Sequence, residues 1–528
     1  MKIFFTYYIL IIILGGAFLT SKCFVNIEND VKFYFVVILS LLLLIICSLR
    51  PSGLMVLFAS IRSIHFCIGV SLLCLMLSFQ GLAQYEELIL SRHIAFPITG
   101  SFENPAGFVA VLCLLFPYPL FLCFQKSFSK RLRLSFMFSC FITFLTIVLS
   151  ESRSGTLSVF STVIVMSVIE SKVVNYLKSH RKFLVSLFIV FIISIYGLYI
   201  LKKDSADGRI LIWNICWDIF CERPFIGHGI YGFQTVYMDY QAAYFVKHPN
   251  SSYMMLADNV IHPFNEWIKI AVNFGIIGLL MITVFVFLLC RNLLQFRGRF
   301  ASIGLSILVS VIILGTFSYP FHYALVCFLT SLVIVFSFSL SSYMKVVSSS
   351  PFRILLSSFL CVVLIVVLRM MLLDIKWAEI YRHSLDGQSE KMLSHYASMM
   401  PEMKYNPLFL YNYSVELNYS NRYKESQEIA KRCKALYNDY DVQLLIADNY
   451  ANMGMPLQAL STYRHASNMI PCRLVPLEAM MSLYLNLSDT VHATQIAQEI
   501  LSKQIKVPSE EVIAIRDSAW NLRVRGVN

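Results

Sequence analysis

The sequence predicts an all-α protein in which a bundle of membrane-spanning helices is followed by a polar helical domain. Hydrophobic residues make up 57% of the 528 residues, charged residues only 14%, and the mean hydropathy is +0.67. A soluble chain of this size could not bury so much apolar surface. The apolar runs end near residue 373. We therefore expect a polytopic transmembrane domain over residues 1–373 and a separate helical domain over residues 374–528.

About eleven apolar runs approach the length that a helix needs to cross a bilayer, which is about 20 residues. The first run begins at Met1 and is not followed by a small-x-small cleavage pattern, so we interpret it as a retained signal anchor. The expected spans lie at about 3–20, 32–49, 60–79, 104–123, 132–150, 155–170, 183–201, 268–290, 301–318, 324–340 and 353–373.

Lysine and arginine collect in alternate loops between these runs, which marks those loops as cytoplasmic. With an odd number of spans, the long loop at 202–267 and the tail after Leu373 then fall outside the cytoplasm. The net charge of +12 is therefore a topology signal, and we expect no nucleic-acid partner. The basic loop residues are Arg50, Arg62, Lys126, Lys130, Arg131, Arg133, Lys172, Lys178, Arg181, Lys182, Arg291, Arg297, Arg299, Lys345 and Arg353.

The 14 cysteines do not indicate a disulfide framework or a metal site. Most of them lie in apolar runs, where cysteine behaves as a small hydrophobic residue. Cys216 and Cys221 lie in the external loop, but their spacing inside one expected helix places them on different faces. The sequence has no CxxC or His/Cys cluster, so we expect no metal and no cofactor.

The longest non-apolar passage inside the apolar region runs over residues 207–269, and the rest of the chain can be interpreted as its scaffold. It opens with Gly208 and Arg209, and then places apolar side chains at steps of three and four residues. That spacing predicts an amphipathic helix along a membrane interface, ended by Arg223-Pro224. The apolar positions are Ile210, Trp213, Trp217 and Phe220.

Glycines follow this helix at positions 227, 229 and 232, in a segment where backbone can approach a ligand closely. A second helix is expected to begin at His262-Pro263, because proline suits the first helical position. Asn265 and Glu266 would then lie in its first turn. The passage is expected to bring an arginine, a glycine segment and a His/Asn/Glu cluster to one face of the membrane.

Two shorter segments place polar residues at the expected external face. Residues 97–117 contain Gly100, Asn104 and Pro105, which a turn ahead of a helix explains. Residues 151–155, with the sequence ESRSG, hold Arg153 between two apolar runs with almost no loop. An arginine at this edge either extends to lipid headgroups or binds an anion, and the segment alone is compatible with both.

Beyond Asp374 the chain repeats itself. Ser426, Ala459 and Ala493 recur at separations of 33 and 34 residues, each within a two-helix pattern. This pattern looks like a tetratricopeptide repeat, which needs small residues where its helices pack closely. We expect about three repeats over roughly 400–505, forming an α-solenoid. Such an array either docks a protein partner or is purely structural, and we favour docking.

Five segments share their order and spacing with a known family: GSFENPAG at 100–107, SRSG at 152–155, GR-x3-W at 208–213, ERPFIGHGIYGF at 222–233, and NEW followed by GIIG from 265 to 278. Together they resemble the O-antigen ligase and polymerase superfamily of membrane glycosyltransferases, over roughly 95–340. The resemblance implies a GT-C-like helical fold in the bacterial inner membrane and a reaction at the periplasmic face, so the loop and the tail that fall outside the cytoplasm are expected in the periplasm. It also implies metal-independent transfer of glycan from an undecaprenyl-pyrophosphate carrier.

The resemblance assigns a pyrophosphate-binding role to two arginines. Arg153 and Arg209 match the residues with which the family holds the lipid pyrophosphate. A guanidinium group pairs bidentately with phosphate oxygens, stays charged, and stabilises the leaving group as its negative charge grows. Asn104, Trp213 and Asn265 are expected to support this site.

His262 is the candidate for the family's catalytic histidine, which deprotonates the acceptor hydroxyl. The family usually places this histidine directly before the asparagine, whereas Phe264 precedes Asn265 here. The base is thus His262, displaced by two positions, or Glu266 beyond the asparagine. Further alternatives are His228, His248 and an acceptor activated without a dedicated base.

The acceptor distinguishes the members of the superfamily. A ligase transfers glycan to the lipid A core, a protein O-oligosaccharyltransferase to protein Ser/Thr, and a polymerase to another repeat unit. We expect the ligase type first, the protein transferase second and the polymerase third. A transporter of lipid-linked glycan is the alternative from a different class, but it should carry polar residues at mid-bilayer, which the spans nearly lack. His322, in a short external loop, is expected to be a structural or entrance residue.

Overall fold

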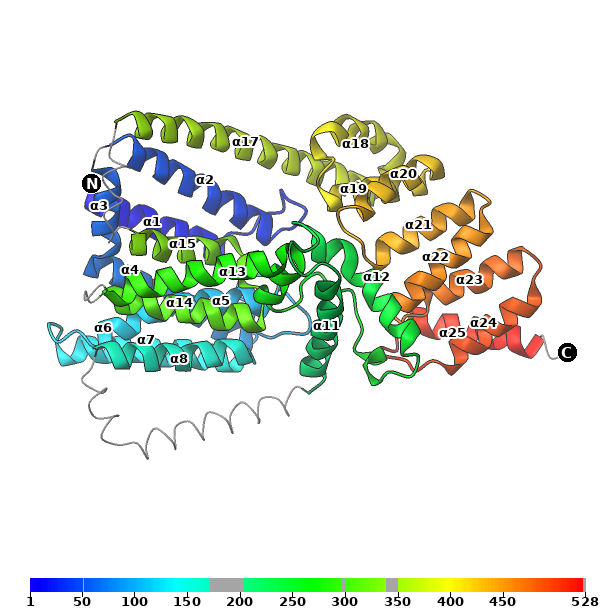
Figure 1. Cartoon of the computed structure of the whole chain (residues 1–528), viewed down its shortest axis with the longest axis horizontal. Helices are drawn as coiled ribbons and strands as arrows, with labels where there is room; N and C mark the ends of the chain where they lie inside the picture. The colour runs from blue at the N-terminus through cyan, green and yellow to red at the C-terminus, as the bar shows by residue number, and fades with distance from the viewer. Residues whose placement is uncertain (51, 171–202, 296–299, 339–349, 526–528) are drawn as a thin grey trace. The chain divides into compact units, whose positions relative to one another are not determined.

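The computed structural model describes residues 1–50, 52–170, 203–295, 300–338 and 350–525, and within them the chain is helical without strands (Figure 1). These residues form two compact units. The bundle unit takes its described residues from 1–198, 264–266 and 281–378. The repeat unit takes them from 199–263, 267–280 and 379–528.

The bundle unit packs its apolar helices around α5 and α6. Within α5, every residue from Gly107 to Leu115 is buried. Glycine lets α5 approach its neighbours closely, because a Cβ added at Gly107 would lie 2.5 Å from the ring of Tyr323. The helices are α1 (Lys2–Phe18), α2 (Asn29–Ser48), α3 (Gly53–Ile61), α4 (Ile64–Tyr85), α5 (Pro105–Leu115), α6 (Pro117–Cys123), α7 (Lys130–Leu149), α8 (Arg153–Glu170), α14 (Phe300–Phe317) and α15 (Ala324–Phe338), with parts of α13 (Glu266–Gln295) and α17 (Ser350–His383).

Seven of the described helices are long and apolar enough to cross a membrane, so the chain is a multi-pass membrane protein. Three shorter apolar helices coincide with further expected spans. The run expected at 183–201 and the basic residues expected at 172–182, 297, 299 and 345 lie outside the described residues. The count of eleven spans therefore stays a prediction.

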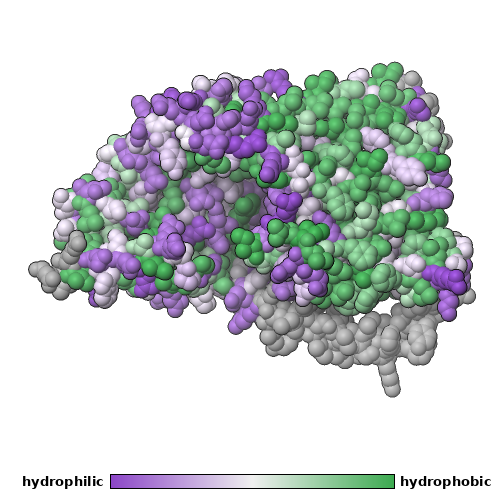
Figure 2. Space-filling model, turned by 180° about the vertical axis from the view of Figure 1, so that it is seen from behind, coloured by the Kyte–Doolittle hydropathy of each residue, from purple (hydrophilic) through white to green (hydrophobic). Residues whose placement is uncertain are grey.

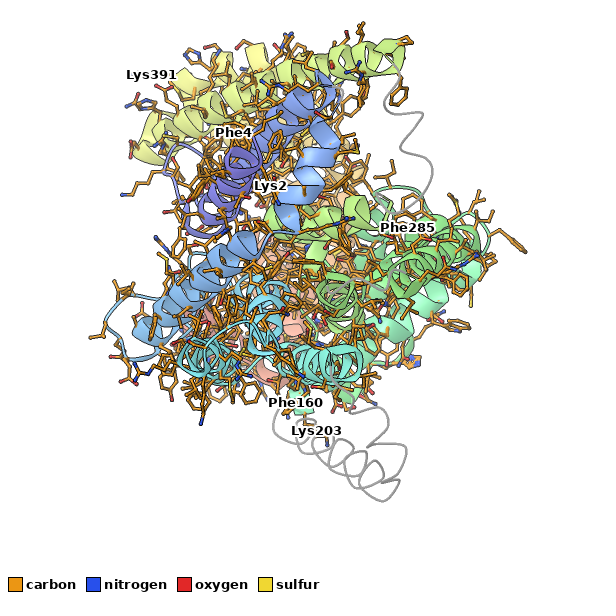
Figure 3. The ribbon with its side chains drawn as sticks, turned by 90° about the vertical axis from the view of Figure 1, so that its left-hand side faces the viewer. Lys2, Phe4, Phe160, Lys203, Phe285 and Lys391 are labelled. Carbon is orange, nitrogen blue, oxygen red and sulfur yellow. The ribbon has the colours of Figure 1, made fainter. Side chains whose placement is uncertain are left out.

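The outer surface of the bundle unit is apolar, as a bilayer requires. Phe4 and Phe160 are about half exposed, and Phe160 lies at the edge of the bundle in Figure 3. The face of the bundle unit in Figure 2 is mainly hydrophobic, whereas the face of the repeat unit in the same view is mainly hydrophilic.

Two of the basic residues expected in cytoplasmic loops contact neighbouring segments of the bundle unit. The Arg50 guanidinium lies 3.0 Å from the Met1 sulfur, and Arg62 stacks over the Phe336 ring at 4.9 Å. These contacts join the segment after α2 to the N-terminus and the segment between α3 and α4 to α15. The sidedness expected from the charge pattern stays a prediction.

The repeat unit contains the predicted amphipathic helix, α11 (Lys203–Glu222), which begins before the expected Gly208. It is followed by α12 (Gly232–Lys247) and η1 (Ser252–Met255), neither of which the sequence predicted. The remaining elements are η3 (Ser384–Gln388), α18 (Ser389–Met403), α19 (Pro407–Tyr419), α20 (Tyr423–Lys434), α21 (Tyr440–Asn452), α22 (Pro456–Met469), α23 (Val475–Asn486), α24 (Thr490–Ser502) and α25 (Glu510–Arg525).

The prediction of a helix start at His262-Pro263 is wrong, because α13 begins at Glu266. Phe264 has a φ of 54°, in the left-handed region, which interrupts any helix running through it. The carbonyl of Pro263 instead accepts a hydrogen bond from the Trp213 indole at 2.9 Å. Asn265 consequently precedes the helix, and Glu266 is its first residue.

The repeat seen in the sequence is a structural period of three helical pairs: α19 with α20, α21 with α22, and α23 with α24. Ser426, Ala459 and Ala493 each occupy the fourth position of the second helix and are fully buried. The turns inside the pairs share a left-handed residue at the same separations, so their backbone repeats too. The assignment of these pairs as tetratricopeptide repeats stays a prediction. The turn residues are Asn421, Gly454 and Ser488.

Candidate active site

In the repeat unit, α11 and the segment before α13 bring three of the predicted residues into one neighbourhood. The Trp213 indole nitrogen donates to the Pro263 carbonyl at 2.9 Å. Arg209 precedes Trp213 by about one helical turn and so projects from the same side of α11. His262 precedes Pro263 in the chain and is half-buried. Arg209 therefore lies about one turn from an indole that is bonded to the residue after His262.

The side of α11 that packs inside the unit is not the predicted apolar stripe. Leu211, Ile215 and Ile219 are buried, whereas Ile210 and Trp217 are exposed. Trp213 and Phe220 of the predicted stripe are half-buried, so only its Ile210 and Trp217 side chains are free to meet a membrane interface.

The glycine segment after α11 packs against α13. The His228 amide donates to the Val272 carbonyl at 2.9 Å, and the Gly229 amide donates to the Asn273 carbonyl at 2.8 Å. Gly227 has a φ of +66°, and a Cβ there would lie 2.4 Å from the Asn273 backbone. Gly227 thus permits two backbone segments of the protein to approach each other, where the sequence suggested a close approach of backbone to a ligand.

Two of the alternative bases have structural partners. The His228 ring nitrogen Nε2 lies 3.1 Å from the Ile219 carbonyl, which ties the glycine segment to α11. His248 follows the last residue of α12 and stacks on Tyr244, with ring centroids 4.6 Å apart. Both contacts account for a histidine at these positions without catalysis.

In the bundle unit, Asn104 caps α5 and connects it to the loop before α15. Its side-chain oxygen accepts from the Ala106 amide and from the Tyr323 hydroxyl, both at 2.9 Å. Its side-chain nitrogen donates to the Tyr319 hydroxyl at 3.2 Å. These bonds fix the start of α5 against the loop before α15, and a supporting role of Asn104 in the site stays a prediction.

Glu103 and His322 form an ion pair beside this cap, with 3.5 Å between Oε1 and Nε2. Burial alone would raise the pKa of Glu103. The contact with His322 and its charge, together with a hydrogen bond from the Asn26 amide at 3.4 Å, outweigh burial and hold that pKa below its ordinary value. The pair agrees with a structural role for His322.

Arg153 is the first residue of α8 and is half-buried. The Ser152 hydroxyl accepts from the Gly155 amide at 3.2 Å at the start of this helix. A Cβ added at Gly155 would lie 2.2 Å from Val109 in the second turn of α5, so the first turn of α8 packs near the start of α5. Arg153 and Asn104 therefore lie at the same end of the bundle unit.

Asn265 and Glu266 are buried at that end as well. The Glu266 side chain lies 3.8 Å from the position that a Cβ at Gly315, near the end of α14, would take. The Phe264 ring packs edge-on against Tyr319 at 5.4 Å between centroids. The first residue of α13 is thus fixed among the helix ends that also hold the Asn104 cap.

The sequence analysis missed Gln84, which orders the loop ahead of α5. Its side-chain oxygen accepts from the Thr99 and Gly100 amides at 3.1 and 2.7 Å, and its nitrogen donates to the Gly100 carbonyl at 2.8 Å. Gln84 is buried at the end of an apolar helix. Two amides four residues apart in an apolar run, Gln80 and Gln84, were the signal that could have found it.

The predicted residues thus fall into two groups. The chain leaves the repeat unit between Pro263 and Phe264 and returns to it between Glu266 and Trp267, so His262 and Glu266 lie on either side of the first crossing. The repeat unit holds Arg209, Trp213 and His262, and one end of the bundle unit holds Asn104, Arg153, Asn265 and Glu266.

Part of the chain that holds most of these residues is similar to a known protein family. Residues 138–283 match the family model described as O-Antigen ligase. This segment is similar to the O-antigen ligase family. No curated protein matches the chain. The O-antigen ligase segment contains every predicted site residue except Asn104, which lies ahead of it. The family relationship indicates a membrane enzyme of the glycosyltransferase kind, with a lipid-linked glycan and an acceptor as substrates.

Proposed function

We propose that the protein is a glycosyltransferase of the O-antigen ligase type in the bacterial inner membrane. It transfers glycan from an undecaprenyl-pyrophosphate carrier to an acceptor hydroxyl at the periplasmic face and requires no metal. The observation that carries this proposal is the family match over 138–283, which contains both arginines and both candidate bases. The hydrogen bond from Trp213, one helical turn after Arg209, to the carbonyl of Pro263, next to His262, supports it.

Arg153 and Arg209 bind the pyrophosphate in this proposal. Each guanidinium offers a planar fork of donors to two phosphate oxygens, which a lysine cannot match. As the bond between the anomeric carbon and the phosphate oxygen breaks, negative charge grows on the pyrophosphate, and fixed cations stabilise it. The half-buried start of α8 and the turn of α11 before Trp213 would hold the two side chains in place.

His262 removes the proton of the acceptor hydroxyl as its oxygen attacks the anomeric carbon. The proton passes to the imidazole, and the carrier pyrophosphate leaves. Glu266 is the alternative base. We favour His262 because it is half-buried on a segment held by Trp213, whereas Glu266 is buried beside α14.

The test is glycan transfer in a bacterial strain that lacks the native gene and carries wild type, Arg209→Ala or His262→Ala. Lipopolysaccharide and glycoprotein fractions are blotted separately at equal membrane levels. Matched controls are Arg422→Ala and His492→Ala, which remove an arginine and a histidine from exposed ion pairs of the repeat helices.

Loss of glycan from one fraction in both site variants, with normal transfer in both controls, supports the proposal and identifies the acceptor. Normal transfer in both site variants contradicts the active-site assignment and directs the next test to transport of lipid-linked glycan.

A protein O-oligosaccharyltransferase is the second candidate function. The helical pairs of the C-terminal region belong to the same compact unit as Arg209 and His262, and helical repeats commonly bind proteins. We propose that these pairs are periplasmic tetratricopeptide-like repeats. Loss of glycan from the glycoprotein fraction alone would favour this candidate, and loss of only the long-chain lipopolysaccharide would favour a polymerase.

A further inference from the structure

The segment between α11 and α12 exposes large apolar side chains although it belongs to a loop. Phe225, Ile226 and Ile230 are 69%, 71% and 71% exposed, and Tyr231 is also exposed. We call residues 225–231 the glycine-loop patch. Exposed apolar side chains gathered on one short segment indicate a surface with an apolar partner.

Several backbone carbonyls around this patch accept hydrogen bonds from within the protein. A segment surrounded by water would not need these bonds, because water could satisfy the same groups. The Ile276 amide donates to the Pro224 carbonyl at 2.8 Å, and the Ile277 amide donates to the Phe225 carbonyl at 3.3 Å. The Asn273 side chain donates to the Ile230 carbonyl at 2.8 Å. Paired backbone groups with apolar side chains turned outward are what the edge of a bilayer demands.

The patch is attached to a helix that is long and apolar enough to span the membrane. Gly275, with a φ of +63° and a ψ of −160°, breaks α13 where the loop meets it. A Cβ at Gly275 would lie 2.3 Å from the Phe225 carbonyl group, so the break admits the loop. Beside the break, α13 exposes Phe274, Ile277 and Leu280. The apolar surface of the patch therefore continues onto the surface of a candidate membrane span.

We propose that the glycine-loop patch lies in the outer boundary between lipid headgroups and acyl chains and contacts the bilayer directly. Apolar side chains on short segments insert to this depth, and tyrosine is enriched there. Loop 202–267 then has a membrane-contacting part at 225–231 in addition to its aqueous part. This inference does not depend on the proposed transfer reaction, because it concerns only the lipid contact of the loop.

The experiment places a fluorescent amino acid at Ile226 or Ile230 of the full chain and reconstitutes each variant in phosphatidylcholine vesicles. Both side chains are highly exposed, so a label replaces few contacts, and equal gel-filtration profiles check folding. Quenching is measured with lipids that carry a nitroxide near the headgroup and, separately, with iodide in the water. Label positions Phe287, in the apolar part of α13, and Leu457, on α22, are the lipid and aqueous controls.

We expect the nitroxide lipid to quench labels at 226 and 230 several-fold more than the label at 457, and iodide to quench them several-fold less. Strong quenching by iodide at both positions would place the patch in water and overturn the proposal. Protection from both quenchers would show that protein covers the patch, as in contact with a second copy, and would also overturn it.

Discussion

The guanidinium of Arg209 is the proposed phosphate ligand whose geometry can be tested by a single conservative change. Arg209→Lys keeps the charge and removes the planar pair of donors. We expect transfer to fall by about tenfold to a hundredfold in Arg209→Lys and by about a hundredfold to a thousandfold in Arg209→Ala. Initial rates of transfer in membranes containing equal protein measure both.

Arg422→Lys is the matched control, because Arg422 forms a surface ion pair with Glu425. Wild-type rates are expected for it. If Arg209→Lys transferred at the wild-type rate too, charge alone would suffice and the bidentate arrangement would be refuted.

The Glu103 carboxylate predicts a pH dependence of stability. Burial opposes ionisation of this carboxyl, but its contacts with His322 and Asn26 hold its pKa in the folded protein below the ordinary value. A depressed pKa contributes stability above the ordinary carboxyl pKa, and that contribution is lost as the pH falls through the folded value. Thermal unfolding in detergent at neutral and acidic pH should therefore show a smaller acid-induced loss in Glu103→Gln than in wild type.

Glu428→Gln, on the exposed side of α20, should keep the wild-type pH dependence. An unchanged acid-induced loss in Glu103→Gln would show that the ion pair with His322 does not contribute to folding stability.

At the scale of elements, the packing of the glycine segment on α13 depends on glycines in two different environments. Gly227 combines a positive φ with a backbone only 2.4 Å from a would-be Cβ, whereas Gly229 has a positive φ and open space around it. We expect Gly229→Ala to cost about 1 kcal/mol and Gly227→Ala clearly more than about 3 kcal/mol, because strain and a backbone clash add. Thermal unfolding of the two variants compares them directly, and equal losses would contradict the close packing of this segment on α13.

The spacing of apolar and small residues along the sequence predicted those elements that depend on neighbouring residues in the chain. The amphipathic helix α11 and the recurrence of Ser426, Ala459 and Ala493 are read from spacing alone. The start of α13 was missed because Pro263 satisfies the local rule for a first helical position, while the left-handed Phe264 interrupts the helix. The close packing of the glycine segment on α13 was also not predicted, because Asn273, against which it packs, is more than 40 residues away in the chain.

At the scale of the whole chain, sequence reasoning found the residue types of the candidate site but not how distant segments hold them. The segments 232–247 and 257–259 bond to the repeat helices through contacts that span about 180 to 250 positions. Contacts between residues so far apart in the chain cannot be predicted from the spacing of residue types. The contacts join Gln241 to Met469, Asp239 to His465, Asn259 to Asp439, Asp258 to Arg473 and Lys506, and Ala257 to Lys506.

These contacts predict that the repeat helices stabilise the segment that leads to His262. Gln241 is fully buried, and its nitrogen donates to the carbonyls of Met469 at 2.7 Å and Asp258 at 3.1 Å. Gln241→Leu leaves both carbonyls short of a donor, which we expect to cost about 1–3 kcal/mol. Asp258→Asn removes only exposed ion pairs with Arg473 and Lys506, which we expect to cost less than about 1 kcal/mol.

Limited proteolysis between α12 and α13, together with the transfer rate, distinguishes the two changes. We expect Gln241→Leu to speed cleavage there and to lower transfer, because the chain before His262 loses an anchor while His262 itself is unchanged. Asp258→Asn, and Gln458→Leu on the exposed side of α22, should leave both readouts near wild type. If Gln241→Leu is cleaved faster but transfers normally, the repeat helices stabilise the loop without positioning His262. If neither readout changes, the buried amide does not hold this segment.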